Sequence, residues 1–323
     1  MAATHPHPRA DESPRGRDAT EPREIPRRGW FDVVRRTKTE ARRDEVSLLA
    51  AGVAFYALLS LVPALAALVS IYGLVADPAD IDRQVADSLA AAPAEVRDLI
   101  AEQMSSVAQQ SQGGLGITVV VGILLALWSA SSGMKHLITA IDVAYDEEET
   151  RGFVALRGRA LLLTVGAIAF VAVAVGVITV VPALLDDTSL GGAGQLAVSI
   201  LRFPFLGLGL MAGLAVLYRY APDRDEPRWG WTAPGTIVAT VLALVGSVLF
   251  SLYTSTMGSY AETYGALGAV VVLMLWLMLM AAAVVIGAEI NAEAERQTAR
   301  DSTTGPEQPL GQRDAYAADT VAS

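Results

Sequence analysis

The sequence predicts an all-α, polytopic membrane protein with six transmembrane helices and a short helical pair on the outer face. Composition is the first reason, because 53% of the 323 residues are hydrophobic, 18% are charged and the mean hydropathy is +0.42. The second reason is the presence of long apolar stretches, since a helix needs roughly 20 such residues to cross a bilayer. Together these observations favour a polytopic membrane protein over a soluble enzyme.

The chain before the first apolar stretch divides into two segments. Residues 1–29 are expected to form a disordered polar tail, since five prolines lie among charged residues there. Residues 30–46 predict an amphipathic helix on the inner membrane surface, with apolar side chains in the interface and arginines against anionic head groups. A solvated linker is the alternative interpretation of this second segment.

The first predicted span, residues 47–76, organises the rest of the chain. It carries no charge, and the seven basic residues that stand before it are expected to stay in the cytoplasm. Tyr56, Ser60 and Pro63 share one face of this helix. Tyr56 and Ser60 are candidate substrate-binding residues, and Pro63 is a candidate kink because it removes a backbone hydrogen bond. The alternative is that Ser60 and Pro63 only shape a packed helix.

Five further spans complete a predicted membrane domain that covers residues 47–294. We expect them at about 114–132, 160–185, 195–218, 231–253 and 265–288. Between the first two spans, residues 77–113 carry a helical stripe of apolar residues and predict two short helices packed at the outer surface. The remaining residues, 295–323, are expected to form a disordered polar tail.

The distribution of basic residues predicts the orientation of the spans. The predicted outer segments carry only Arg83 and Arg97, whereas every predicted inner segment carries at least three lysines or arginines. Six spans with both termini in the cytoplasm therefore satisfy the positive-inside rule at each loop. Trp229 and Trp231 lie where an aromatic belt is expected.

Polar side chains after the second span are further candidates for substrate binding. On the helix that continues from this span, Lys135 and Asp142 share one face, and His136 lies on another. These side chains line an inner vestibule, or they belong to an ordinary helix end that emerges into the cytoplasm. The sequence leaves both interpretations open.

Glu289 stands at the inner end of the sixth span, where the helix dipole disfavours an acidic side chain. It therefore needs a basic partner. We expect that partner among Arg151, Arg157 and Arg159, in a contact that closes the helix bundle on the cytoplasmic side. Glu289 is accordingly a candidate structural or gating residue.

Arg202 is the leading candidate for substrate binding, because it lies seven residues into the fourth span. An arginine costs about 2.5–3.5 kcal/mol at the centre of a span and less near an interface, so something should offset that cost. Its side chain reaches the outer head groups, pairs with an outer acid, or grips the phosphate of a lipid or anionic solute. Pro204 would open the helix beside it and leave carbonyls free.

Seven short motifs occur in order along the chain. They are FYALLSLVP at 55–63, LWSASSG at 127–133, IDVAYDEEETRGF at 141–153, LYRYAPD at 217–223, WGWTAPGT at 229–236, YGALGAVVVLMLWL at 264–277 and GAEINAE at 287–293. Together they resemble the YihY/BrkB family of bacterial inner-membrane proteins over about Phe31 to Glu293. Two positions depart from the family pattern, because Asp142 and Ala261 stand where asparagines are expected.

The resemblance implies a fold of six membrane helices with both ends in the cytoplasm of a bacterium. It also brings a functional label, since the family has long been named after ribonuclease BN. Its members are now considered mainly as transporters of lipids or solutes.

The sequence lacks the residue types that ribonuclease chemistry needs. A metal-dependent nuclease needs clustered His, Asp or Glu ligands, yet His136 is the only histidine outside the N-terminal tail. The sequence has no cysteine, no GxxxxGK[ST] motif and no run of interleaved aromatic and basic residues. We therefore expect no enzyme activity, cofactor or metal, and no binding of ATP or nucleic acid.

Transport or translocation of a lipid or an anionic solute is the function that the sequence favours. Interrupted spans and polar groups inside the membrane are what a pathway through lipid requires. The alternative is a non-catalytic membrane scaffold or partner-binding protein, whose small residues pack helices without moving anything. Membrane lipids are the expected partners, and a homo-oligomer is left open.

Overall fold

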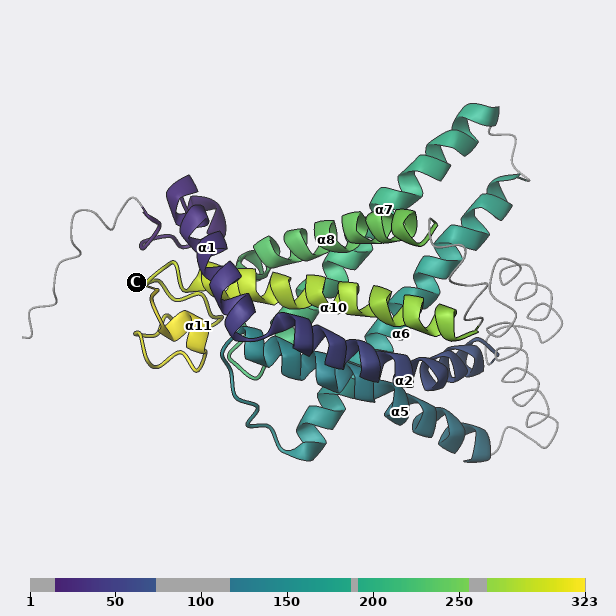
Figure 1. The fold of residues 1–323 in the computed structure, drawn as a ribbon, viewed down its shortest axis with the longest axis horizontal. Coiled ribbons are helices and arrows are strands. Elements are labelled where there is room, and N and C mark those ends of the chain that lie inside the picture. Colours follow the sequence, from purple (N-terminus) through teal and green to yellow (C-terminus); the bar gives the residue numbers. More distant parts are fainter. Residues whose placement is uncertain (1–14, 74–116, 187–190, 256–265, 323) are drawn as a thin grey trace, which may run out of the picture.

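The computed structural model describes residues 15–73, 117–186, 191–255 and 266–322 (Figure 1). Within these ranges the regular structure is helical, apart from an isolated antiparallel bridge between Pro227 and Thr303. The all-α prediction is therefore confirmed. The expected outer helical pair, residues 77–113, lies outside the described residues.

Six helices of 27 to 34 residues form the body of the described chain, and each overlaps one of the six predicted apolar stretches. They are α2 (Val46–Gly73), α5 (Ile117–Ala144), α6 (Phe153–Asp186), α7 (Gly191–Tyr220), α8 (Trp229–Ser255) and α10 (Ala266–Glu295). Both α5 and α10 continue well past their predicted spans. Polar residues that the sequence places after a span therefore lie on the same rigid helix.

The helix α10 lies at the centre of the arrangement. It packs against α2, α5 and α8, and these four helices run in roughly the same direction (Figure 1). The helices α6 and α7 pack against each other and cross the bundle obliquely, so that one end of this pair extends away from it (Figure 1).

Three helices are long and apolar enough to cross a bilayer within the described part of the chain. They are Phe153–Ala174 in α6, Trp229–Thr254 in α8 and Val270–Glu295 in α10. A fourth candidate joins α1 (Arg27–Arg43) to Val46–Leu61 of α2, at an angle of 63°. Several apolar helices of this length define a multi-pass membrane protein.

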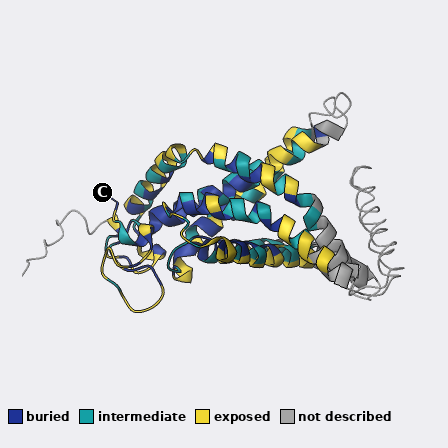
Figure 2. Cartoon of the chain, turned by 90° about the horizontal axis from the view of Figure 1, so that it is seen from below, coloured by how far each residue is buried: buried dark blue, intermediate teal, exposed yellow. Residues whose placement is uncertain are grey.

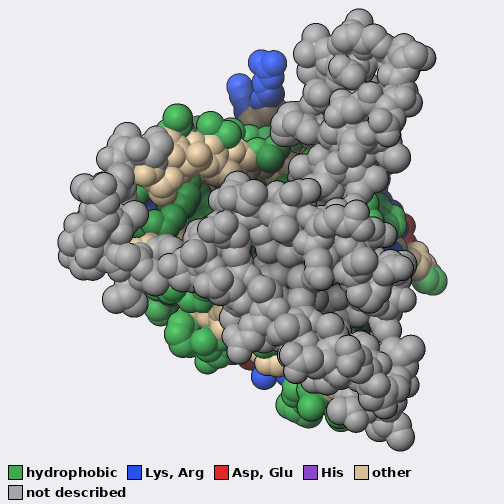
Figure 3. All heavy atoms as spheres, turned by 90° about the vertical axis from the view of Figure 1, so that its right-hand side faces the viewer, with side chains coloured by type: hydrophobic (Ala, Val, Ile, Leu, Met, Phe, Trp, Pro, Cys, Tyr) green, Lys and Arg blue, Asp and Glu red, His purple; other side chains and the backbone are tan. Residues whose placement is uncertain are grey.

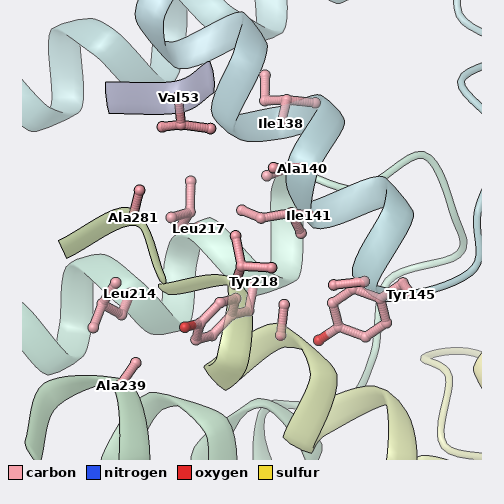
Figure 4. Close-up of a cluster of buried hydrophobic side chains, with 14 of the residues drawn as sticks. Val53, Ile138, Ala140, Ile141, Tyr145, Leu214, Leu217, Tyr218, Ala239 and Ala281 are labelled. Atoms are coloured by element: carbon pink, nitrogen blue, oxygen red, sulfur yellow. The ribbon is translucent and has the colours of Figure 1, made fainter. Parts of the chain in front are cut away.

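Buried side chains concentrate at one end of the bundle, which we call the polar end (Figure 2). Here α1, the loops 145–152 and 221–228 and the C-terminal residues 296–322 gather. The core that underlies this end includes Ile138, Tyr145 and Tyr218 (Figure 4).

Large apolar side chains face outward along the rest of the bundle, most regularly on α8. The stripe there consists of Ile237, Val241, Leu244, Val245, Val248 and Leu249. The described side chains that are visible from the opposite end of the bundle are also mostly hydrophobic (Figure 3). A continuous apolar surface of this kind fits contact with lipid.

The C-terminal residues differ from the disordered tail that the sequence predicts. Residues 296–322, which we call the C-terminal cap, fold over the polar end and include a short helix α11 (Tyr316–Asp319). The buried guanidinium of Arg313 organises the cap by donating hydrogen bonds to the carbonyl oxygens of Ala299, Arg300, Gln308 and Ala318. Hydrogen bonds to backbone carbonyl groups thus contribute to holding this segment, and composition alone does not reveal them.

The N-terminal segment also differs from the prediction, since residues 15–29 are folded. A 3-10 turn, η2 (Pro22–Glu24), precedes α1, and Ile25 packs with Val33 and Trp231 in a small buried cluster. The backbone N–H of Ala299 donates to the carbonyl of Arg17, which ties this segment to the C-terminal cap. Residues 15–29 and the C-terminal cap therefore pack against each other at the polar end.

Candidate functional site

A buried ion pair between Arg224 and Glu295 lies at the centre of the polar end. Neither side chain has exposed surface, and Arg224 donates two hydrogen bonds to the carboxylate, at 2.7 and 3.2 Å. Ser302 Oγ donates a third at 2.6 Å, and the Tyr145 ring lies 5.0 Å from the guanidinium. Burial lowers the pKa of Arg224, but the Glu295 carboxylate outweighs this and raises it above its ordinary value. The two side chains therefore form a two-pronged, buried guanidinium–carboxylate pair.

A second group of charges surrounds Arg151, between the end of α5 and the 221–228 loop. The guanidinium lies 2.6 Å from Glu149, 3.4 Å from Asp223 and 4.0 Å from Asp142. Asp142 Oδ1 accepts a hydrogen bond from the backbone N–H of Asp223 at 2.9 Å, whereas Oδ2 is buried with no hydrogen-bond partner among the described residues. Burial raises the pKa of Asp142 to about 7. This carboxyl group, beyond the apolar part of α5, thus exchanges its proton near neutral pH.

A third group links α1 to α10. Arg36 on α1 pairs with Glu293 and donates to Gln297 Oε1 at 2.8 Å. Glu293 also accepts from Arg296 at 2.6 Å, and Arg296 lies 3.8 Å from Asp146. These contacts fix α1 against the end of α10.

Glu289 belongs to the polar end but not to its ion pairs. Its side chain is 1% exposed, its Oε1 atom has no hydrogen-bond partner among the described residues, and the carboxyl group of Asp44 at the α1–α2 junction lies near it. Two neighbouring carboxyl groups disfavour each other's ionisation. Burial also raises the pKa of Asp44.

The predicted pairing of Glu289 with an inner-loop arginine is therefore wrong. Arg151 binds the acids described above, Arg157 donates to α5, and Arg159 donates to the carbonyl oxygen of Tyr220 at 2.9 Å. The physical reason is that all three arginines lie on or before α6, whereas Glu289 lies on α10, which packs against α2, α5 and α8.

Four of the seven sequence motifs meet at the polar end. The 141–153 and 217–223 motifs contact each other through Asp142 and Asp223. The 229–236 and 287–293 motifs contact each other where Gly235 N–H donates to Asn291 Oδ1 at 2.7 Å. The motifs that carry the resemblance thus form one buried, polar junction.

The predicted residues Tyr56, Ser60, Lys135 and His136 come together farther along the bundle, where α2 packs on α5. The rings of Tyr56 and His136 stack with centroids 3.5 Å apart. Ser60 Oγ accepts a hydrogen bond from the Gly133 N–H at 2.9 Å, at a close approach of the two helices. Asp142 is separate from this group and belongs to the Arg151 cluster.

An arginine of α6 adjoins these residues, although sequence reasoning did not select it as a binding residue. Arg157 donates to the carbonyl oxygen of Trp128 at 2.5 Å and to Ser132 Oγ at 3.3 Å, and its guanidinium lies 4.3 Å from the centre of the Trp128 ring. Ser132 is one helical turn from Lys135 and His136 on α5, so the three side chains share a surface. We call Lys135, His136 and Arg157, with Tyr56, Trp128 and Ser132, the cationic face.

The cationic face differs from the polar end in its electrostatics. Arginines 36, 151, 219, 224, 296 and 313 each pair with a carboxylate. Lys135, His136 and Arg157 form no ion pair with any residue that the structure describes. Trp128 is 45% exposed and the adjoining Phe153 is 66% exposed, so this surface lies on the outside of the bundle rather than in its interior.

The remaining predicted residues are only partly placed. Arg202 lies within α7, but its side chain is outside the described part of the chain. Pro63 and Pro204 lie inside α2 and α7, each of which the structure describes as a single helix. The kink expected at each proline stays a prediction.

Sequence reasoning missed Arg157 as a binding residue because it treated this residue as a positive charge of the inner loop and as a candidate partner of Glu289. The sequence did contain a signal, because Arg157 is a charged residue inside the apolar helix α6, four residues after that helix begins at Phe153. The pairing of Arg224 with Glu295 left no such local signal, because the two residues are 71 positions apart in the sequence.

Several apolar helices with a polar, ion-paired end define the class of protein, which is an integral, multi-pass membrane protein. Residues 37–311 match the family described as virulence factor BrkB, so the chain belongs to this family and the resemblance seen in the sequence is confirmed.

Curated relatives agree with this assignment. The chain is 31% identical over 250 residues to YfkH of Bacillus subtilis (strain 168), a protein named ribonuclease-like, and the match covers 75% of this chain and 87% of YfkH. It is 26% identical over 264 residues to a UPF0761 membrane protein of Photobacterium profundum, covering 78% and 77% of the two chains. A UPF0761 membrane protein of Rhodospirillum centenum is 32% identical over 141 residues, covering 41% and 32%. No solved structure matches the chain.

Proposed function

We propose that this protein translocates anionic lipids across the membrane, and that the cationic face binds their phosphate groups. The observation that carries the proposal is the absence of any carboxylate partner for the two charged side chains of this face, Lys135 and Arg157, among the described residues. Charged side chains that border lipid are costly and mark substrate pathways by default. An anion from outside the chain would complete the charge balance here.

The geometry of Arg157 supports this role. Its bonds to Ser132 and the Trp128 carbonyl hold the guanidinium in one orientation, and the Nε atom is buried with no hydrogen-bond partner among the described residues. A planar guanidinium is well suited to phosphate, and Lys135, one helical turn from Ser132 on α5, adds a second charge. Arg202 is proposed as a further phosphate contact on the outer side.

The proposal includes an orientation. Six spans, with both termini and the polar end in the cytoplasm of a bacterial inner membrane, would place the cationic face in the inner half of the bilayer. Alkaline-phosphatase fusions after Gly192 or Ser259 are expected to be active, because the enzyme needs export to fold. Fusions after Asp225 or Arg300 are expected to be inactive, and an active fusion at Arg300 would overturn the topology.

Translocation is tested with purified protein in liposomes that contain a fluorescently labelled anionic lipid. A membrane-impermeant quencher then reports how fast the label changes leaflets. The wild type is expected to accelerate this exchange many-fold over protein-free liposomes. Lys135→Gln is expected to slow it strongly, because the substitution removes one phosphate-binding charge and the Lys135 ammonium has no internal ion pair to lose.

Arg157 gives a sharper comparison, because two replacements separate charge from geometry. Arg157→Lys keeps the charge but loses the fork of donors, and we expect it to restore only part of the activity that Arg157→Gln abolishes. Arg300→Gln is the matched control, since it removes an exposed cation of the C-terminal cap far from the cationic face. Exchange that is no faster than in empty liposomes would favour the scaffold alternative.

A further inference from the structure

The helix α1 has two faces of different character. Gly29, Val33 and Thr37 are buried on one face, and Arg36 on the same side pairs with Glu293 of α10. A side chain at Gly29 would clash, because its Cβ would lie 2.3 Å from the carbonyl oxygen of Arg15. These contacts leave α1 no freedom to rotate about its axis.

The opposite face of α1 is exposed and unites two large apolar side chains with a row of positive charges. Phe31 is 71% exposed and Val34 is 60% exposed. The exposed basic residues on this side are Arg27, Arg28, Arg35, Lys38 and Arg42. None of the five forms an ion pair with the described residues, whereas the neighbouring Arg43 lies 3.4 Å from Glu40.

The bend after α1 places this face beside the membrane. The chain turns by 63° between α1 and the first part of α2, with Glu45 at a φ of 50° in the turn. The helix therefore crosses the direction of the apolar helices instead of continuing it. Leu48, just after the turn, is 67% exposed, so exposed apolar surface begins directly next to α1.

We propose that the outward face of α1 binds the anionic lipid surface of the membrane that the protein spans, with Phe31 and Val34 in the head-group region and the basic side chains on phosphates. The chemistry is that of an interfacial amphipathic helix, in which shallow apolar anchors act together with electrostatic attraction to anionic lipid. The inference stands on α1 alone and does not depend on lipid translocation. The sequence places the apolar side chains Trp30, Phe31, Val33 and Val34 in the interface, whereas in the structure Val33 and Trp30 pack against the protein.

The absence of cysteine makes the test direct, since one introduced cysteine takes a single spin label. Phe31→Cys in the otherwise unchanged chain is labelled and reconstituted into vesicles of phosphatidylcholine alone, or of phosphatidylcholine with phosphatidylglycerol. Accessibility to oxygen, which partitions into lipid, is compared with accessibility to a water-soluble nickel complex. Leu310→Cys, at an exposed position of the C-terminal cap, is the control.

With phosphatidylglycerol present, the oxygen-to-nickel accessibility ratio at position 31 is expected to rise several-fold over that in phosphatidylcholine alone, and position 310 is expected to stay accessible to nickel. Neutralising Arg27, Arg28, Arg35 and Lys38 to glutamine is expected to reverse the rise. A label at position 31 that stays open to nickel in both vesicles would overturn the proposal. Equal protection in both vesicles and in detergent would also overturn it, since that result indicates a second protein copy on this face.

Discussion

Replacing Glu295 by glutamine is expected to lower the melting temperature of the detergent-solubilised protein by many degrees. The substitution leaves the fully buried guanidinium of Arg224 without its carboxylate. Breaking a buried ion pair by removing one partner costs about 3–5 kcal/mol, because the remaining charge is desolvated and uncompensated. Fluorescence-monitored thermal unfolding measures the loss.

Glu289→Gln provides the matched control, with the same chemical change six residues earlier on the same helix. Glu289 lies near the carboxyl group of Asp44 rather than an arginine, and a neutral glutamine amide removes the unfavourable interaction between two neighbouring carboxyl groups. Its melting temperature should equal or exceed that of the wild type. An equal fall in both variants would mean that Glu289 is ionised and paired with a cation.

A second large effect is expected from Gly235→Ala, at the crossing of α8 and α10. A Cβ at Gly235 would lie 1.9 Å from the Gly287 carbonyl oxygen and 2.6 Å from the side chain of Asn291. A backbone oxygen cannot swing aside, so the two helices would have to separate. Overpacking costs typically about 1–3 kcal/mol, and this clash lies at the severe end of that range.

The same substitution at Gly166 is the control, because nothing lies within 4 Å of a Cβ built there. Alanine favours a helix over glycine, so Gly166→Ala should leave the melting temperature unchanged or raise it. Yield of monodisperse protein after size-exclusion chromatography gives a second readout. If Gly235→Ala melted like the wild type, the close crossing of α8 and α10 would be refuted.

Much of the fold could be predicted from the sequence, because membrane helices are determined locally. A long apolar stretch satisfies its backbone hydrogen bonds within itself, so each of the six stretches is already a helix before it meets a partner. The sequence also selected Tyr56 and His136, which are stacked in the structure. It offered no reason to bring them together, since they lie on different helices.

The ends of the chain show where local reasoning failed. Their composition predicts disorder, yet Arg313 satisfies four backbone carbonyls and thereby folds the C-terminal cap. The sequence around a single arginine in a polar segment does not show whether its side chain is solvated or buried. Only its final surroundings distinguish the two.

The sequence by itself determined the all-helical character of this protein, its apolar stretches and its family, since each depends on residues that are close together in the chain. The tertiary structure decided the partners of its charges. Arg36 and Glu293 are 257 positions apart, and Glu289 meets an acid where a base was expected. An ion pair depends on which helix faces lie opposite each other, and no local pattern records that. For the same reason, only the fold revealed that the cations of the cationic face lack carboxylate partners within the described residues.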